Sequence, residues 1–163
     1  MAENKAAPNN TISRLDISAA TTYSIKTVKI PSQLWNCTPN AASYNIQNPM
    51  ARFEAVNAGF NSGREELEIP LTILKEGGTA GKVDFHYQSL ATLRVIIDKT
   101  ITAAIAKHKE VWVVIGAGHH VDKSGFQKGG GIIEAEVETW LKKANMRFAK
   151  GKGGGSGGAI LIY

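Results

Sequence analysis

The chain has 163 residues and a formal net charge of +5 at pH 7. Its single cysteine, Cys37, excludes an internal disulfide and a Cys-x-x-Cys zinc site. No apolar run approaches the roughly 20 residues that a membrane span needs, and the start MAENKAAPNNTIS lacks the apolar core of a secretion signal. We therefore expect an intracellular protein, cytoplasmic or mitochondrial, without membrane contact.

Charge and composition divide the chain near Gly78. Residues 1–78 hold 7 Lys or Arg and 7 Asp or Glu, whereas residues 79–163 hold 12 and 7. All 5 prolines precede the division, and all 4 histidines follow it. The sequence therefore predicts two segments of different character, 1–78 and 79–163.

Residues 1–78 are predicted to form an irregular, largely extended segment with little regular structure, because no sustained hydrophobic period is present. Residues 25–30 alternate as one edge strand would, and Pro31 then ends the strand. Residues 49–58 favour a short helix with proline in its first turn. Such a segment either becomes ordered on the second segment or a larger partner, or is a disordered leader.

Residues 79–163 alternate between strand and helix patterns. Strands are expected at 83–86, 111–115, 146–149 and 159–163, and amphipathic helices at 89–109 and 132–144. This order predicts an α/β fold, a two-layer βαβαββ sandwich with a mostly parallel sheet.

Candidate site residues gather at one edge of this sheet. Alternation places Val83 and Phe85 on one face of the first strand and Asp84 and His86 on the other, on an open face or at its rim. The loop after the second strand leaves at the same edge, where ligands collect in open α/β sheets. We therefore expect Asp84 and His86 to lie near four loop residues, which are Gly116, Gly118, His119 and His120.

These residue types suit cleavage of RNA through its own 2′-hydroxyl. Histidine transfers protons near neutral pH, so His86 is the candidate proton-transfer residue and Asp84 its orienting partner or a second base. His119 or His120 would supply the complementary acid, and the loop from Gly116 to Gly118 would bring backbone N–H groups close to phosphate oxygens. The plain alternative is a solvated polar pair at a strand edge. A zinc site is a further alternative, but adjacent histidines rarely bind one metal, so we predict no metal and no cofactor.

The basic residues indicate a polyanionic partner. Residues 142–152 contain five basic side chains and no acid, followed by a glycine-rich stretch, and two more lysines lie in the loop after the second strand. A solvated helix end followed by a flexible loop is the alternative. The candidate nucleic-acid-binding side chains are Lys123, Lys128, Lys142, Lys143, Arg147, Lys150 and Lys152.

Together these pieces resemble the Smr domain, the small MutS-related module. The matching pieces are the acid-x-His element at 83–86, the Gly-x-Gly loop from Ile115, the helix residues 137–141 and the glycine-rich approach to the last strand at 154–162. The resemblance implies a two-layer sandwich, nucleic-acid binding and, in several branches, endonuclease activity. It casts Asp84 and His86 as the pair linked to cleavage.

The chain also departs from the family pattern, since Tyr87 stands where the family usually has glycine and Ala117 lies between the loop glycines. These departures favour binding over cleavage. Two functions stay open. One is an RNA-binding Smr protein, an endoribonuclease acting on ribosome-associated or single-stranded RNA, with RNA favoured over DNA. The other is a non-catalytic structural or assembly component of a large ribonucleoprotein such as a mitochondrial ribosome, which the N-terminal segment would contact.

Overall fold

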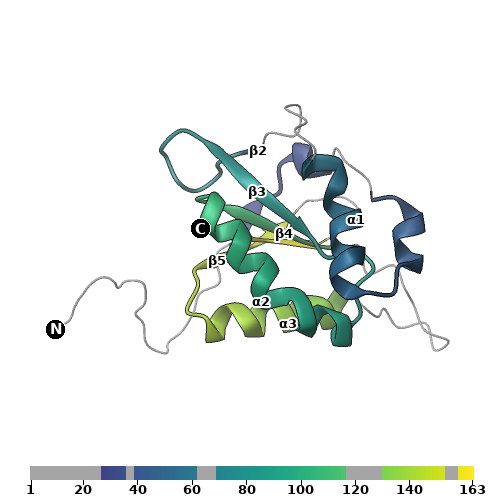
Figure 1. Cartoon of the computed structure of the whole chain (residues 1–163). Helices are drawn as coiled ribbons and strands as arrows, with labels where there is room; N and C mark the ends of the chain where they lie inside the picture. The colour runs from purple at the N-terminus through teal and green to yellow at the C-terminus, as the bar shows by residue number, and fades with distance from the viewer. Residues whose placement is uncertain (1–26, 36–38, 62–68, 117–129, 153–157) are drawn as a thin grey trace.

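The computed structural model describes residues 27–35, 39–61, 69–116, 130–152 and 158–163. These residues form a six-stranded mixed sheet with three α-helices and two short 3-10 helices (Figure 1). The strands are β1 (Thr27–Lys29), β2 (Ile69–Pro70), β3 (Thr79–Asp84), β4 (Val111–Gly116), β5 (Phe148–Lys152) and β6 (Gly158–Ile162). The helices are η1 (Ser32–Trp35), η2 (Ala41–Asn45), α1 (Pro49–Asn61), α2 (Leu90–Lys107) and α3 (Gly130–Lys143). The predicted α/β class is confirmed.

The strand order across the sheet is β1-β5-β6-β4-β3-β2. Strands β1, β3, β4 and β5 point in one direction, because β6 is antiparallel to both β4 and β5. Only two of the five neighbouring pairs are parallel, so the predicted mostly parallel sheet is wrong. The reason is the short link between β5 and β6. Such a link returns the chain antiparallel, whereas a parallel pair needs a long crossover.

The central strand β4 is apolar on both faces. Val111, Val113 and Ile115 belong to one buried cluster, and Trp112 and Val114 belong to another. The first cluster is completed by apolar side chains of the helices, and Figure 1 shows α2 and α3 beside each other on that side of the sheet. The predicted apolar face of α3 is confirmed, with Ile133, Val137 and Leu141 buried.

The second face is covered by residues that precede β3. Ile30 and Leu34 are buried there against Trp112, and Leu71 and Ile73 pack against the same cluster. The expectation of an open face is therefore wrong, because a strand with Trp112 and Val114 on that side would expose a large apolar area to water.

The described part of the N-terminal segment is more regular than the sequence predicts. The expected edge strand is present as β1, which pairs in parallel with β5. The expected short helix is present as α1, which continues past Gly59 to Asn61. Phe53 on α1 packs against Phe85, with ring centroids 5.8 Å apart. These residues thus form part of the same sheet and core as residues 79–163. The sequence of residues 1–78 alone shows no regular spacing of apolar residues that would have predicted this.

A buried carboxylate fixes the connection between β2 and β3. Glu110, which immediately precedes β4, is fully buried. Its two oxygens accept hydrogen bonds from the backbone N–H groups of Thr72, Ile73 and Leu74 at 2.8 to 2.9 Å. Because these amides converge on one charge, the carboxylate holds Leu71 and Ile73 against the second face of the sheet.

We predict that Glu110→Ala lowers the free energy of unfolding by about 2–4 kcal/mol, since it leaves backbone donors without an acceptor. Glu110→Gln should lose less, because its amide oxygen still accepts. Urea unfolding followed by circular dichroism measures both. The matched control is Glu76→Ala, an exposed acid of the same connection. A loss in Glu110→Ala no greater than in this control would contradict the prediction.

His108 ends α2 and packs against the start of β3. Its backbone N–H donates to the carbonyl of Ala104 at 3.0 Å. Its ring lies against Gly81, where a β-carbon would overlap the ring atoms, so glycine is required there for space. Burial, and secondly the nearby charge of Lys107, lower the pKa of His108 below its usual value of 6.5. The folded protein therefore binds the His108 proton less readily than the unfolded chain does.

This lowered pKa predicts a stability loss in acid. The contribution of His108 is fully present above about pH 6.5, the pKa in the unfolded chain, and is lost as the pH falls through the lower folded pKa. We expect the free energy of unfolding to fall more steeply between pH 7.5 and pH 5 for the natural chain than for His108→Gln. Denaturant unfolding at both pH values measures the difference. Equal losses in the two proteins would show that His108 does not contribute.

Candidate functional site at the carboxyl end of β3

Asp84 and His86 form a hydrogen-bonded pair where β3 ends. The Oδ1 atom of Asp84 accepts from the backbone N–H of His86 at 2.9 Å and lies 2.6 Å from His86 Nδ1. Asp84 is 2% exposed, whereas the side chain of His86 is 27% exposed. Because a carboxylate can only accept, the proton of the neutral ring is on Nδ1 and its lone pair on Nε2. The imidazole is thus oriented by a buried acid.

The turn after β3 explains why these side chains meet. Phe85 makes the last ladder bond of the strand, to Val114 O at 2.9 Å, and Gln88 N donates back to Phe85 O at 3.2 Å. Between them Tyr87 has φ 69°, in the left-handed region that favours glycine. This tight turn folds the N–H of His86 onto the carboxylate two residues earlier, a local pattern typical of aspartate.

The amide of Asn57, on α1, holds the backbone of Asp84. Asn57 Oδ1 accepts from Asp84 N at 2.9 Å, and Nδ2 donates to Asp84 O at 3.0 Å. Among the described residues, strand β2 pairs with Thr79 and Ala80 of β3, so no described strand lies at the outer edge of Asp84. The buried amide takes the place of that strand. The sequence did not indicate this role of Asn57, since an asparagine within a helix has no pattern that marks it.

Arg52, which precedes Asn57 on α1, binds the backbone of the turn after β3. Its Nη1 donates to Tyr87 O at 2.6 Å, and its Nε donates to Ile46 O at 2.7 Å. The guanidinium therefore links η2, α1 and the turn after β3. Arg52 was also missed, because its two carbonyl partners have no side-chain signal in the sequence.

Asp84 and Lys82 share the face of β3 that the N-terminal segment covers. Lys82 Nζ donates to Leu34 O, in η1, at 2.7 Å. Alternation along the strand puts Asp84 on the same side, which explains its burial. The predicted separation of Val83 and Phe85 from Asp84 is confirmed, since the two apolar side chains lie in the helix-side cluster.

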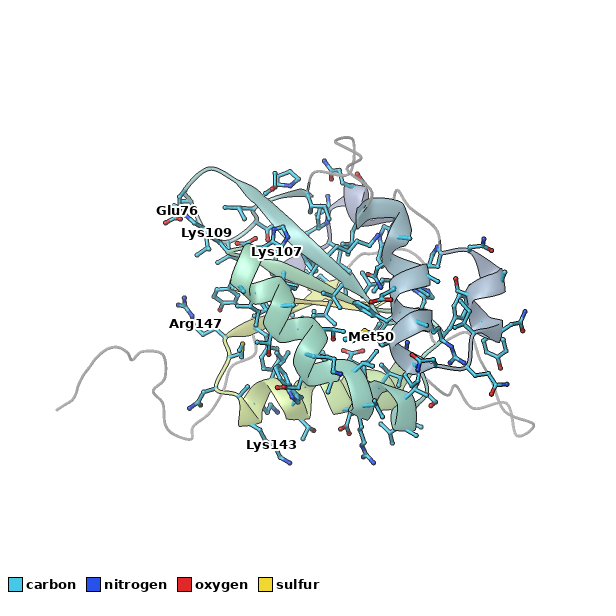
Figure 2. All side chains as sticks on the ribbon, viewed as in Figure 1. Met50, Glu76, Lys107, Lys109, Lys143 and Arg147 are labelled. Atoms are coloured by element: carbon cyan, nitrogen blue, oxygen red, sulfur yellow. The ribbon has the colours of Figure 1, made fainter. Side chains whose placement is uncertain are left out.

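Several predicted basic residues lie far from the Asp84–His86 pair. Helix α3 follows β4 and leads the chain back to the beginning of β5. Its last residues are Lys142 and Lys143, and Arg147 immediately precedes β5, so all three lie near the beginning of that strand. In Figure 2, Lys107, Lys109, Lys143 and Arg147 all lie to the left of Met50 of α1, the helix that contacts Asp84. The structure therefore does not bring these side chains to the pair.

Lys150 forms ion pairs with two acidic side chains of α3. Its Nζ lies 2.9 Å from Glu138 and 3.0 Å from Glu134, and these contacts raise the pKa of Lys150. Exposed Lys152 instead ends β5 beside exposed Lys29 of β1, at the edge where β3 and β4 also end. Three strand spacings of about 4.8 Å separate β5 from β3, and a fourth separates β1 from β5, so Lys152 lies roughly 14 Å and Lys29 roughly 19 Å along this edge from Asp84.

Of the remaining predicted site residues, one is described by the structure and five are not. Gly116 ends β4, next to β3. Gly118, His119, His120, Lys123 and Lys128 lie outside the described residues. Within the described ranges, no three His, Cys, Asp or Glu side chains gather as a metal ion would require.

Comparison of the chain with protein-family models, curated proteins and solved structures yields no match. None of the helices in the described part of the chain combines the length and apolar character of a membrane span.

We predict that Asn57→Ala lowers the free energy of unfolding by roughly 2–4 kcal/mol, because it leaves a buried N–H and a buried C=O of Asp84 unpaired. Guanidinium unfolding measures the loss. Asn45→Ala, which removes an exposed asparagine of η2, is the control and should change stability by less than about 0.5 kcal/mol. Similar losses in both variants would show that the amide does not support the edge of β3.

Proposed function

We propose that the protein binds RNA at the sheet edge where β3 and β4 end and that the Asp84–His86 pair transfers a proton during RNA cleavage. One observation carries the proposal: a buried carboxylate binds Nδ1 of a partly exposed histidine at 2.6 Å. A histidine held this way has a fixed tautomer, with Nε2 ready to accept a proton from a bound substrate.

The proposed cleavage reaction needs only proton transfers and no cofactor. Nε2 of His86 takes the proton of a ribose 2′-hydroxyl, and the 2′-oxygen attacks the adjacent phosphorus. A new phosphorus–oxygen bond closes a 2′,3′-cyclic phosphate while the bond to the 5′-oxygen breaks. The leaving oxygen receives a proton from an acid, for which the sequence offers His119 or His120. Asp84 stabilises the imidazolium that forms.

Two further features support an Smr-like interpretation. The order of elements from β3 to β6 is βαβαββ, as that resemblance implies. Tyr87 adopts φ 69° at the position where the family usually has glycine. A left-handed backbone is the reason for glycine at such a position, so the local geometry is compatible with the family pattern even though the residue differs.

Phosphate binding would use the same edge of the sheet. The backbone end of β4 at Gly116 lies beside β3, and Lys29 and Lys152 lie farther along. Cationic side chains along one edge can follow the charge of a nucleic-acid backbone.

The proposal predicts that the full chain cleaves a labelled RNA strand and that His86→Ala reduces the rate by about 100-fold or more, the usual share of a proton-transfer residue. Asp84→Asn should also reduce it, since an amide can donate to Nδ1 and leave Nε2 protonated. Gel electrophoresis measures the rate and identifies the cyclic-phosphate product.

His108→Gln, which changes a histidine near the beginning of β3, is the control and should cleave at the natural rate. A strand with 2′-O-methyl groups should stay intact with every variant. Equal RNA decay in the natural chain, His86→Ala and Asp84→Asn would overturn the catalytic role. RNA binding without cleavage would favour the alternative of a non-catalytic ribonucleoprotein component.

A further inference from the structure

Two tyrosines extend the Asp84–His86 site outward. The rings of His86 and Tyr87 meet edge-on, with centroids 5.8 Å apart. Tyr87 meets Tyr44 of η2 in the same manner at 5.9 Å. The three rings thus form a continuous aromatic series that begins at the buried acid and ends at the surface.

The outer ring, that of Tyr44, is exposed to solvent. Tyr44 is 60% exposed, and it is one of only three large apolar side chains so exposed among the described residues. The other two, Val95 and Ile132, lie on α2 and α3. Tyr44 alone is aromatic and adjoins a candidate site. Packing of the core does not require a ring in this position.

Arg52 fixes the arrangement. Its guanidinium carbon lies 5.9 Å from the centre of the Tyr44 ring, while its nitrogens bind the carbonyls of Ile46 and Tyr87. The side chain is therefore held by two hydrogen bonds beneath an exposed ring. A cation near one side of an aromatic ring adds to its attraction for the π-system and phosphates of a nucleotide.

Tyr87 is held in an unfavourable backbone conformation. A residue with a β-carbon is disfavoured at φ 69°, and the turn would form more readily with glycine. Strained residues that persist beside a site are a reason to look for a function of their side chains. Here the side chain is the ring that connects His86 with Tyr44.

We infer that Tyr44 and Tyr87 form a stacking surface for an unpaired base of the RNA, next to the ribose that His86 deprotonates. The inference rests on the proposed function and specifies its substrate class as single-stranded RNA. A base within a duplex is already stacked and paired, so an exposed ring gains nothing from it. A splayed base presents a free face to the ring.

Binding of a short fluorescein-labelled 2′-O-methyl RNA strand, which resists cleavage through the 2′-hydroxyl, tests the inference by fluorescence anisotropy. We expect Tyr44→Ala to weaken binding of the single strand by roughly 5- to 100-fold, the usual effect of removing one stacking ring. Tyr44→Phe keeps the ring and should bind within about twofold of the natural chain. Because Tyr44 is exposed, both variants should keep the natural circular dichroism spectrum.

Two further probes separate stacking from charge. The same strand annealed to its complement, and an abasic strand of equal length, should bind the natural chain and Tyr44→Ala equally. Equal affinity of both proteins for the single strand would overturn the stacking surface and leave RNA binding intact. An equal loss on the duplex would also overturn it, since the ring would then not contact an unpaired base. Failure of the natural chain to bind any of the three probes would overturn the proposed function and the inference together.

Discussion

Burial of β4 on both faces is the constraint on which the rest of the structure depends. Val111, Val113 and Ile115 need cover on one side, and Trp112 and Val114 need it on the other. Helices α2 and α3 cover only the first side. The second is covered by the chain before β3, through Ile30, Leu34 and the connection that Glu110 holds. A sheet with helices on one face alone would leave Trp112 in water, so the N-terminal residues are required for the core.

The candidate site depends on the same arrangement. Cover on the second face buries Asp84, and α1 contributes both Asn57, which pairs with the backbone of Asp84, and Arg52, which holds the carbonyl of Tyr87. The geometry of His86 is therefore set by residues from both halves of the chain. An acid-x-His element on a solvated strand would leave its carboxylate hydrated and its histidine free to rotate. Here the carboxylate is removed from water and directs a single ring orientation.

Much of the secondary structure could be predicted, since local patterns determine it. The apolar period of residues 89–109 corresponds to α2, the β-branched run 111–115 to β4, and the alternation at 83–86 to two opposite faces. The missed contacts are long-range and polar. Asn57 is 27 residues from Asp84 and Arg52 is 35 residues from Tyr87, and each binds backbone atoms, which look alike in every residue. The cover of the second face was missed for a similar reason: Ile30, Leu34, Leu71 and Ile73 are scattered, and only the fold brings them together.

The separation of the basic side chains changes how an RNA-binding surface is to be understood. Residues 142–152 are a single basic run in the sequence, but α3 and β5 distribute them over two ends of the sheet, and Lys150 is bound by Glu134 and Glu138. Lys142 and Lys143 also lie in the last turn of α3, where cations offset the negative end of the helix dipole. The described cations next to the Asp84–His86 pair are Arg52 and Lys82, and both donate to backbone carbonyls. The proposed RNA binding at that edge would therefore need contacts in addition to phosphate pairing with the described cations. The described side chains best suited to supply them are the rings of Tyr44 and Tyr87, which gives a physical reason for a tyrosine where the backbone favours glycine.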